Sequence, residues 1–504
     1  MKRKIQIFAL LTVFCSQACQ QFLTEEPASV LNPVTYYVDE AALNSGVYAA
    51  YANLRAIYGQ DESPFRLTIL GTDLFTNGKN QSGLPFDNYS PDLNSFAPEV
   101  GYLWNNCYKT INLCNTITVS APEVSMNEVT RARVMAEARF IRALCYFWLV
   151  QSFGDIPLPL QPTAGVQREV ARVSGEEVYE VILEDLRYAE ANLESTYPQW
   201  GRIRKGAVQH LLSKVHLVRE DWSAAANYAK QVIADEANYA LLSDFSQVFH
   251  YENQENKEII FSIQYEYDPI NSGSGNLTHV YFTNSYSDIP GLMRALQWGR
   301  PFTRYAPTPY LMGLFDDEKD ARTDIWRTFD DYYYNDPNNL PPGKNLGDPL
   351  DPSLRERPEF HPALIKYWDP TRPTVNELRG NKDFIVFRLA ETYLIAAEAL
   401  MMQGDRVEAT WFFNEVRRRA QRPGYDLTIS ADELSVDLIL DERGRELAGE
   451  MHRWFDLIRS GKALERIKAH SARGQSIQSF HLLRPIPQAE IDRANNEVAQ
   501  NIGY

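Results

Sequence analysis

Apolar residues recur every three to four positions in several long stretches of the chain, which is the pattern of amphipathic helices. The clearest stretch is residues 131–154, where one apolar stripe runs up to Gly154 and prolines follow shortly after. Residues 174–193 repeat the same period, and Ser174 followed three positions later by Glu177 is the signature of a capping box. Each apolar stripe must pack on another element, so these segments predict a helical core.

Two further segments predict helix pairs. Residues 206–233 and residues 387–420 each read as two helices joined by a tight turn, with alanines near the point where the helices would cross. This arrangement is typical of tetratricopeptide-type repeats. Repeats of that kind bury a common core by stacking, so the two pairs are expected to meet in space although they lie far apart in the sequence.

A second kind of sequence alternates with the helical stretches, and it is rich in Gly, Pro, Asn, Asp, Ser and aromatic residues. Within it, residues 258–267 alternate in polarity and predict a strand. Long loops in a compact protein are usually functional or disordered, and a high aromatic content argues against disorder. The chain is therefore predicted to be mostly α, with a tetratricopeptide-like helix-pair scaffold, long irregular loop-rich insertions and a few short strands.

The beginning of the chain resembles a bacterial export signal. Lys2, Arg3 and Lys4 form a basic start, and an apolar run of about ten residues follows that is too short to span a bilayer. The letters SQAC, which end at Cys19, resemble the lipobox of bacterial lipoproteins, in which the cysteine sulfur carries a lipid. We expect Cys19 to be lipidated and to anchor the mature protein, with ordinary signal peptidase cleavage as the alternative.

The expected organisation is a signal peptide over residues 1–18 and a single domain over residues 19–504. The helical scaffold is expected at about residues 35–58, 100–235 and 384–470, and the loop-rich ligand face at about residues 59–99 and 265–380.

Charge and cysteine content exclude several classes of function. The formal net charge is −16, and loss of the three cations of the signal segment would make it −19. Such acidity, without a basic stretch to offset it, argues against nucleic acid and polyanionic substrates. Cys107, Cys114 and Cys145 show no metal-ligand spacing, so we expect buried free thiols and neither a metal nor a cofactor.

Catalytic motifs are also missing from the sequence. There is no HExxH, Walker or GxGxxG pattern, and Ser274 stands in a Gly-Ser loop without the strand–turn–helix context of a hydrolase nucleophile. The many carboxylates leave a glycosidase open as an alternative, because the sequence does not show how far apart they lie. We expect a binding protein rather than an enzyme.

Aromatic residues make up 12% of the chain, and many of them lie in the loop-rich regions. Sugar rings present apolar C–H faces and hydroxyl edges, so a site for them requires flat aromatic rings beside polar side chains. Four tryptophans, Trp104, Trp148, Trp411 and Trp454, lie on amphipathic helices and are expected in the core. The loop residues chosen by composition as ligand contacts are Asp73, Asn77, Tyr286, Trp298, Arg300, Trp326 and Tyr333, with packing of loop on scaffold as the alternative role.

Five segments, taken in order, resemble the SusD/RagB family of surface lipoproteins. They are the CQQFLTEEP start, the ARFIRALCYFWLVQSFGDIPL helix, FRLAETYLIAAEALMMQGD, LDERGRELAGEMHRWFDLIRSGK and the LLRPIPQAEIDRANNEVAQNIGY ending. The resemblance covers nearly the whole chain. It implies tetratricopeptide-like helix pairs under a loop-rich face, an outer-membrane location facing outward, and a SusC-like TonB-dependent transporter as partner.

Within that resemblance the ligand class stays open. The first expectation is an oligosaccharide that the protein delivers to the transporter, and the alternative within the family is a peptide. A structural adaptor that binds only its transporter is a third possibility, but an adaptor has no need of aromatic loops.

Overall fold

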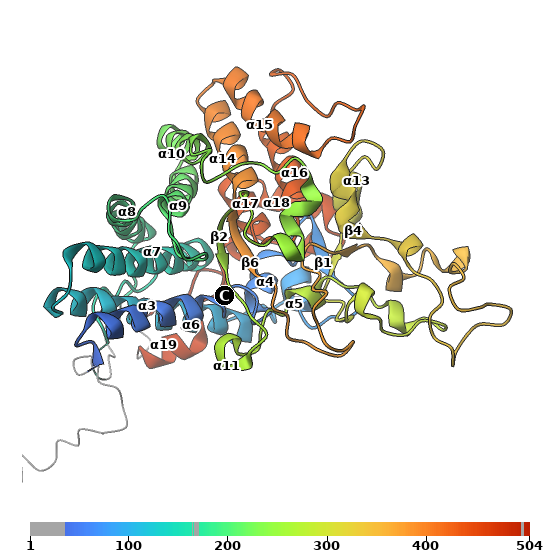
Figure 1. Ribbon diagram of the computed structural model, residues 1–504, viewed down its shortest axis with the longest axis horizontal. Coiled ribbons are helices and arrows are strands. Elements are labelled where there is room, and N and C mark those ends of the chain that lie inside the picture. The colour runs from blue at the N-terminus through green and yellow to red at the C-terminus, as the bar shows by residue number, and fades with distance from the viewer. Residues whose placement is uncertain (1–35, 164, 166–170, 495–497) are drawn as a thin grey trace, which may run out of the picture.

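The computed structural model describes residues 36–163, 165, 171–494 and 498–504, and helices dominate it (Figure 1). The helices of the first half of the chain are α3 (Glu40–Leu54), α4 (Ser63–Thr68), α5 (Leu84–Asn88), α6 (Pro98–Ser120), α7 (Glu128–Phe153), α8 (Gly175–Asn192), α9 (Lys205–Val218) and α10 (Trp222–Ala234). Those of the second half are α11 (Pro269–Ser272), α12 (Thr278–Tyr281), α13 (Pro309–Gly313), α14 (Leu389–Met402), α15 (Arg406–Ala420), α16 (Val436–Glu446), α17 (Arg453–Arg459), α18 (Ala463–His470) and α19 (Gln488–Arg493). The predicted fold class is confirmed.

The apolar stripes identified in the sequence form the helical core. Helix α7 packs between α6 and α8, and it ends where expected, because Gly154 adopts a φ of +74° that favours glycine. Helix α8 begins at the predicted cap, where the Ser174 hydroxyl accepts a hydrogen bond from the backbone N–H of Glu177.

The two predicted helix pairs exist and meet in space. The pair α9–α10 packs against the pair α14–α15 through α10 and α14, as Figure 1 shows near its top. Their shared apolar cluster contains Ala225, Ala226 and Ala229 of α10 together with Ala409 of α15. Alanine side chains leave the helix backbones free to approach closely, so helix pairs distant in sequence stack on one another.

The predicted cysteines and core tryptophans are confirmed with one exception. Cys107, Cys114 and Cys145 are buried free thiols, and three of the four tryptophans are buried. Trp411 is instead 48% exposed, so its assignment to the core is wrong. The neighbouring Phe412 takes the buried position on α15, and a helix turns successive residues about 100° apart.

Three short two-stranded sheets connect the helices to the loops. They pair β1 (Phe75–Asn77) with β3 (Tyr305–Pro307), β2 (Ile259–Ile263) with β6 (Phe384–Arg388), and β4 (Trp326–Arg327) with β5 (Ala363–Leu364), all antiparallel. The predicted strand is thus present as β2. Its partner β6 was expected to be part of the helical scaffold. It is extended because its backbone pairs with β2, a contact with a segment far away in the sequence.

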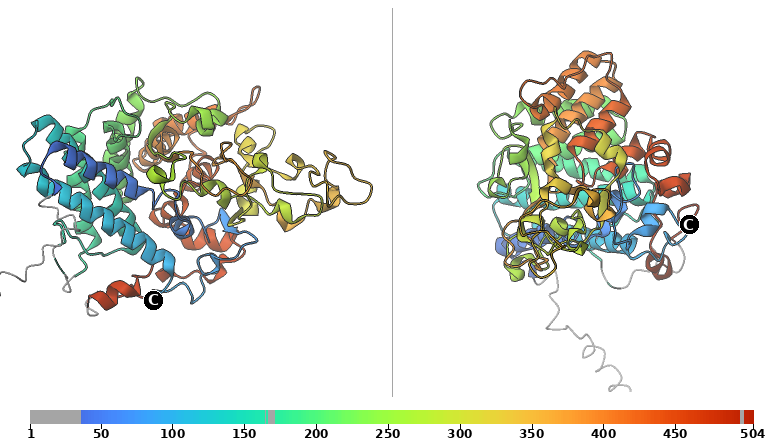
Figure 2. Two further views of the ribbon diagram at one scale, coloured as in Figure 1. Left: turned by 60° about the horizontal axis from the view of Figure 1, so that its bottom comes forward. Right: turned by 90° about the vertical axis from the view of Figure 1, so that its right-hand side faces the viewer.

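One loop-rich segment projects from the helical body and has its own apolar core. Figures 1 and 2 show it extending away from the helices, in the yellow part of the colour range. Its buried cluster consists of Tyr286, Ile289, Leu292, Trp298, Phe329, Tyr332, Tyr334, Leu350 and Phe360. The aromatic residues of this region therefore hold the projecting segment together.

Within the described residues, no helix combines the length and the apolar character required to cross a bilayer. The predicted signal peptide and Cys19 lie outside the described residues.

Candidate ligand-binding groove

Two loop regions that are far apart in the sequence meet at one surface. The pairing of β1 with β3 places Asn77 opposite Tyr305, and the hydrogen bonds continue beyond the strands. The backbone N–H of Gly78 donates to the Arg304 carbonyl at 3.0 Å, and that of Asn80 donates to the Thr303 carbonyl at 3.2 Å. A Cβ on Gly78 would lie 2.4 Å from the Thr303 oxygen, so this close approach requires glycine.

An open groove of about 300 Å³ lies where these loops meet. Its lining residues are Lys79, Asn80, Ser285, Ser287, Asp288, Arg294, Pro301, Phe302 and Thr303. Most of them offer a hydrogen-bond donor or acceptor, and Phe302 is the one aromatic ring among these lining residues. The groove thus combines one flat apolar surface with a polar rim.

Two cations lie next to the ring of Phe302. The guanidinium groups of Arg300 and Arg304 each lie 5.2 Å from the centre of its ring. The Nε atom of Arg304 lies 2.8 Å from a carboxylate oxygen of Glu62, and its Nη1 donates to the Ser82 hydroxyl at 2.9 Å. These contacts fix the ring before a ligand arrives, which lowers the entropy cost of binding.

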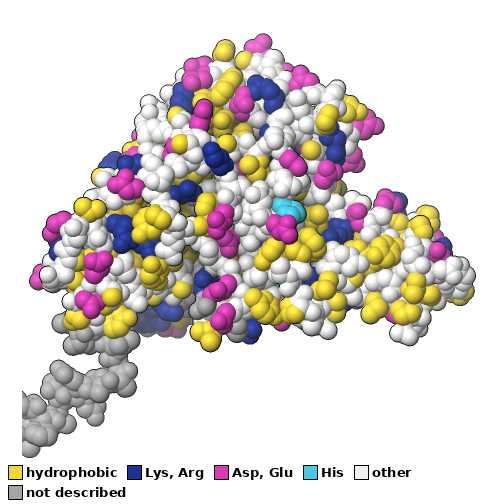
Figure 3. All heavy atoms as spheres, in the orientation of Figure 1, with side chains coloured by type: hydrophobic (Ala, Val, Ile, Leu, Met, Phe, Trp, Pro, Cys, Tyr) yellow, Lys and Arg dark blue, Asp and Glu magenta, His cyan; other side chains and the backbone are white. Residues whose placement is uncertain are grey.

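The charges at the groove rim pair with one another. The Nζ atom of Lys79 lies 2.7 Å from Oδ2 of Asp288 and 3.5 Å from Oε1 of Glu359. The hydrogen bond that Lys79 donates to the Asp288 carboxylate raises the pKa of Lys79, so the lysine stays protonated at neutral pH. Figure 3 shows the same balance across the face that it displays, where acidic and basic side chains are interspersed. A neutral ligand with many hydroxyl groups matches such a site better than a strongly charged one.

Asp73 lies inside the protein, away from this groove. Its side chain is fully buried and accepts two hydrogen bonds from Arg453 and one from Arg466. Burial raises the pKa of Asp73, but the two guanidinium groups together lower it by more than burial raises it. The pKa of Asp73 therefore lies below its usual range. Its assignment to the ligand face is corrected to a buried ion pair, because its partners lie about 380 residues later in the chain.

Tyr286, Trp298 and Trp326 are also buried. The ring of Trp298 is 3% exposed and packs on Tyr286 at 5.3 Å between ring centres, while the Tyr286 hydroxyl donates to the Gly299 carbonyl. Trp326 packs on Phe75, 6.4 Å away, with 5% of its surface exposed. Loop packing, the alternative role, is therefore what the structure shows for these three rings, and they offer almost no surface to a ligand.

Of the other three candidates, Asn77 at the end of β1 is also buried, with 6% of its surface exposed. Arg300 is half-buried against Phe302, and Tyr333 is 41% exposed beside Gln297. Ligand contact by these residues stays a prediction. The groove lies within the loop regions chosen from the sequence, but that choice did not include Lys79, Asp288 and Phe302. The alternation of Arg300, Phe302 and Arg304 was the available signal for a ring beside two cations.

Comparison with known proteins gives a consistent result over almost the whole chain. One family model, described as "SusD family", matches residues 257–504, and a second, described as "Starch-binding associating with outer membrane", matches residues 21–217. A curated relative, SusD-like protein P25 of Formosa agariphila, is 28% identical over 97% of both chains. The starch-binding protein SusD of Bacteroides thetaiotaomicron is 26% identical over 75% of this chain and 74% of its own.

Solved structures share the fold. A laminarin-binding SusD-like protein superposes with a TM-score of 0.75 at 24% identity, covering 93% of this chain and 100% of its own. Surface glycan-binding protein A from Bacteroides fluxus has a TM-score of 0.74 at 22% identity, with 93% and 100% covered.

Proposed function

The chain belongs to the SusD family, and we propose that it is a cell-surface lipoprotein that binds oligosaccharides and delivers them to a SusC-like TonB-dependent transporter. In this proposal the lipid on Cys19 anchors the protein to the outer membrane, and the loop-rich face carries the ligand. The protein binds its ligand and does not cleave it.

The observation that carries the proposal is the groove between the loop after β1 and the loop before β3. A half-buried phenyl ring, Phe302, lies beside hydroxyl, amide and charged groups, as recognition of a sugar ring requires. Asp288 is the one carboxylate among the described lining residues, and Lys79 pairs with it. A glycosidase needs two carboxyl groups that flank the scissile bond, so this lining favours binding over hydrolysis.

The names of the relatives support the same ligand class. Relatives named for binding starch, laminarin and surface glycans share this fold, although none of those names identifies the glycan that this chain binds. The peptide alternative remains the second candidate within the family, and the test below distinguishes the two.

The test is calorimetric titration of the protein with neutral plant, algal and microbial oligosaccharides and with mixed peptides. The variant Phe302→Ala should weaken binding of the preferred sugar by about 1–3 kcal/mol, because it removes the ring on which the sugar would rest. Phe96→Ala is the matched control, since Phe96 is 77% exposed and is not among the groove lining residues. Unchanged affinity in Phe302→Ala would remove this groove from the proposal, binding of peptides alone would favour the peptide alternative, and sugar products would indicate a glycosidase.

Membrane attachment has its own test. Cys19→Ala should leave the fold intact and release the protein from outer-membrane fractions, because the acyl chains provide the attachment. If this variant still sediments with membranes in cells that lack the transporter, the lipid anchor is wrong.

A further inference from the structure

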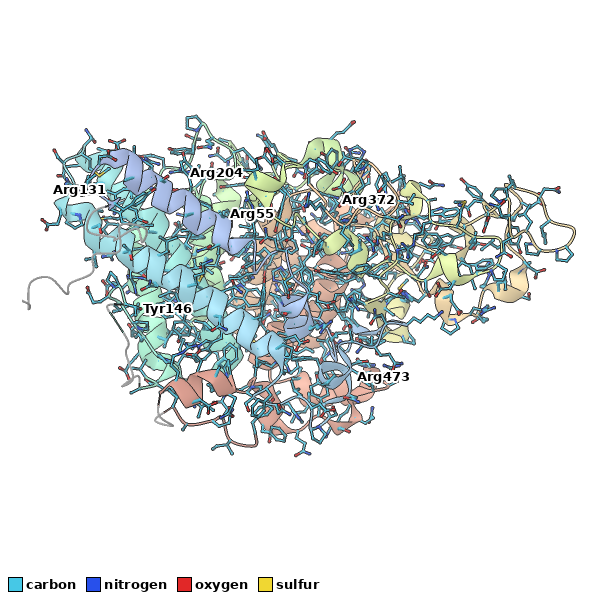
Figure 4. All side chains as sticks on the ribbon, turned by 90° about the horizontal axis from the view of Figure 1, so that it is seen from below. Arg55, Arg131, Tyr146, Arg204, Arg372 and Arg473 are labelled. Atoms are coloured by element: carbon cyan, nitrogen blue, oxygen red, sulfur yellow. The ribbon has the colours of Figure 1, made fainter. Side chains whose placement is uncertain are left out.

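A second open groove lies on another part of the surface, between α3, the loop before α9 and the segment that follows β2. Its volume is about 530 Å³. Arg55 lies at the end of α3 and Arg204 just before α9, and Figure 4 labels both on the side of the molecule away from the projecting segment. Its lining shares no residue with the groove lined by Phe302, so the two grooves are separate.

A glycine shapes one wall of this groove. Gly201 has a φ of +83°, and a Cβ on it would lie 1.2 Å from Oε1 of Gln264. The amide of Gln264 is itself fixed, because its Nε2 donates to the Ser262 hydroxyl at 3.0 Å and to Asp383 at 3.1 Å. The loop thus comes directly against the segment after β2, and both residues that flank the glycine, Trp200 and Arg202, line the groove.

Two tyrosine rings of α3 also line the groove, and the guanidinium of Arg202 lies against them. Its guanidinium lies 5.0 Å from the ring centre of Tyr48 and 5.7 Å from that of Tyr51. Glu137 accepts hydrogen bonds from Arg202 at 2.5 Å and from the Tyr51 hydroxyl at 2.7 Å, which balances the arginine charge. The ring of Tyr48 remains 49% exposed, so a flat aromatic surface is prepared and accessible.

Two buried donors at this groove lack acceptors. The indole N–H of Trp200 and the Nε–H of Arg202 have no hydrogen-bond partner among the described residues, and Arg202 is only 5% exposed. Both atoms are covered by neighbouring groups, so a ligand oxygen would reach them after a small shift of the two side chains. Because a buried donor without an acceptor is costly, that contact would be favourable. None of the described lining residues carries a carboxylate that would accept these hydrogen bonds.

We propose that this groove is a second saccharide-binding site, for a neutral sugar whose C–H face rests on Tyr48 and whose hydroxyl oxygens accept from Trp200 and Arg202. The inference rests on the proposed function, because it assigns the same ligand class to a second place on the molecule. A polymer long enough to reach both grooves would be held at two points, which raises its affinity without any new contact.

The experiment counts binding sites. A neutral hexasaccharide selected from an oligosaccharide array is titrated calorimetrically into the whole protein, and we expect about two equivalents to bind. Tyr48→Ala should weaken the second site by about tenfold or more and leave the Phe302 site intact, whereas Tyr48→Phe, which keeps the ring, should bind as the parent does. Trp200→Phe keeps a ring but removes the N–H, and it should also weaken only the second site.

Trp411→Ala serves as the matched control, because that ring is similarly exposed, at 48%, and lies on α15 away from both grooves. One equivalent bound by the parent, with no change in Tyr48→Ala, would overturn the second site and leave the proposed function standing. No binding of any sugar would overturn both. Thermal melting of each variant shows that a loss of binding is not a loss of fold.

Discussion

Replacing Asp73 by Asn is expected to destabilise the protein by about 3–5 kcal/mol while leaving ligand affinity unchanged. Oδ1 of Asp73 lies 2.7 Å from Nε of Arg453, and Oδ2 lies 2.5 Å from Nη2 of the same residue and 3.0 Å from Nε of Arg466. All three side chains are at least nine-tenths buried. The neutral amide would remove the negative charge and leave two buried guanidinium groups with less compensation.

Most of that cost falls on Arg453. Arg466 would keep its ion pairs with Asp437 and Asp441, whereas Arg453 would keep only its hydrogen bond to the Leu440 carbonyl among the described residues. One uncompensated buried charge is the situation in which removing a single partner costs several kcal/mol.

The effect should also depend on pH. Burial raises the pKa of Asp73, but Arg453 and Arg466 lower it by more than burial raises it. The pKa of Asp73 in the native protein is therefore below the ordinary value. A carboxylate with a lowered pKa contributes stability that is present above its unfolded pKa and is lost as the pH falls through the native pKa. The difference between the parent and Asp73→Asn should therefore be full at pH 7 and shrink in strong acid.

The assay is urea unfolding followed by tryptophan fluorescence at pH 7 and again near pH 3. Asp432→Asn is the matched control, because Asp432 is exposed and its carboxylate forms no ion pair with any described residue. A loss below about 1 kcal/mol at pH 7, with an unchanged m-value, would refute the buried-pair reasoning. Full stability combined with a loss of sugar affinity would return Asp73 to the ligand site.

Two other perturbations follow from burial. Trp298→Ala should reduce stability by about 3–5 kcal/mol in urea unfolding, because it empties the centre of the aromatic cluster, and Tyr333→Ala at its exposed edge should cost much less. Burial lowers the pKa of His279 to about 4, so between the ordinary histidine value and pH 4 the unfolded chain binds a proton that the native protein does not. The free energy of unfolding should fall as the pH decreases through that window. In the variant His279→Gln, the dependence of this free energy on pH should be flatter over the same window. An unchanged slope in the variant would show that His279 titrates normally.

Helices and their ends were predictable because their signals are local. Each signal lies within a short stretch of sequence, and each predicted feature is present in the structure. They are the apolar stripe before Gly154, the cap at Ser174 and the two alanine-containing helix pairs. The prediction that Trp411 is buried was wrong because two adjacent aromatic residues compete for one buried position. Only packing of α15 against α14 selects Phe412 for that position. The prediction that residues 384–388 belong to the helical scaffold was wrong because their extended backbone depends on pairing with β2, which is distant in the chain.

The fold class and the family resemblance could be predicted from the sequence alone, and so could the loop regions in which the groove lies. The sequence did not determine which residues of those loops reach the surface. Composition assigned Asp73 and Trp298 to the ligand, whereas tertiary structure buried them against Arg453 and Tyr286 and placed Lys79 and Phe302 at the groove. The physical reason is that helical periodicity depends on neighbouring residues, while burial of a loop side chain depends on whatever distant segment folds over it.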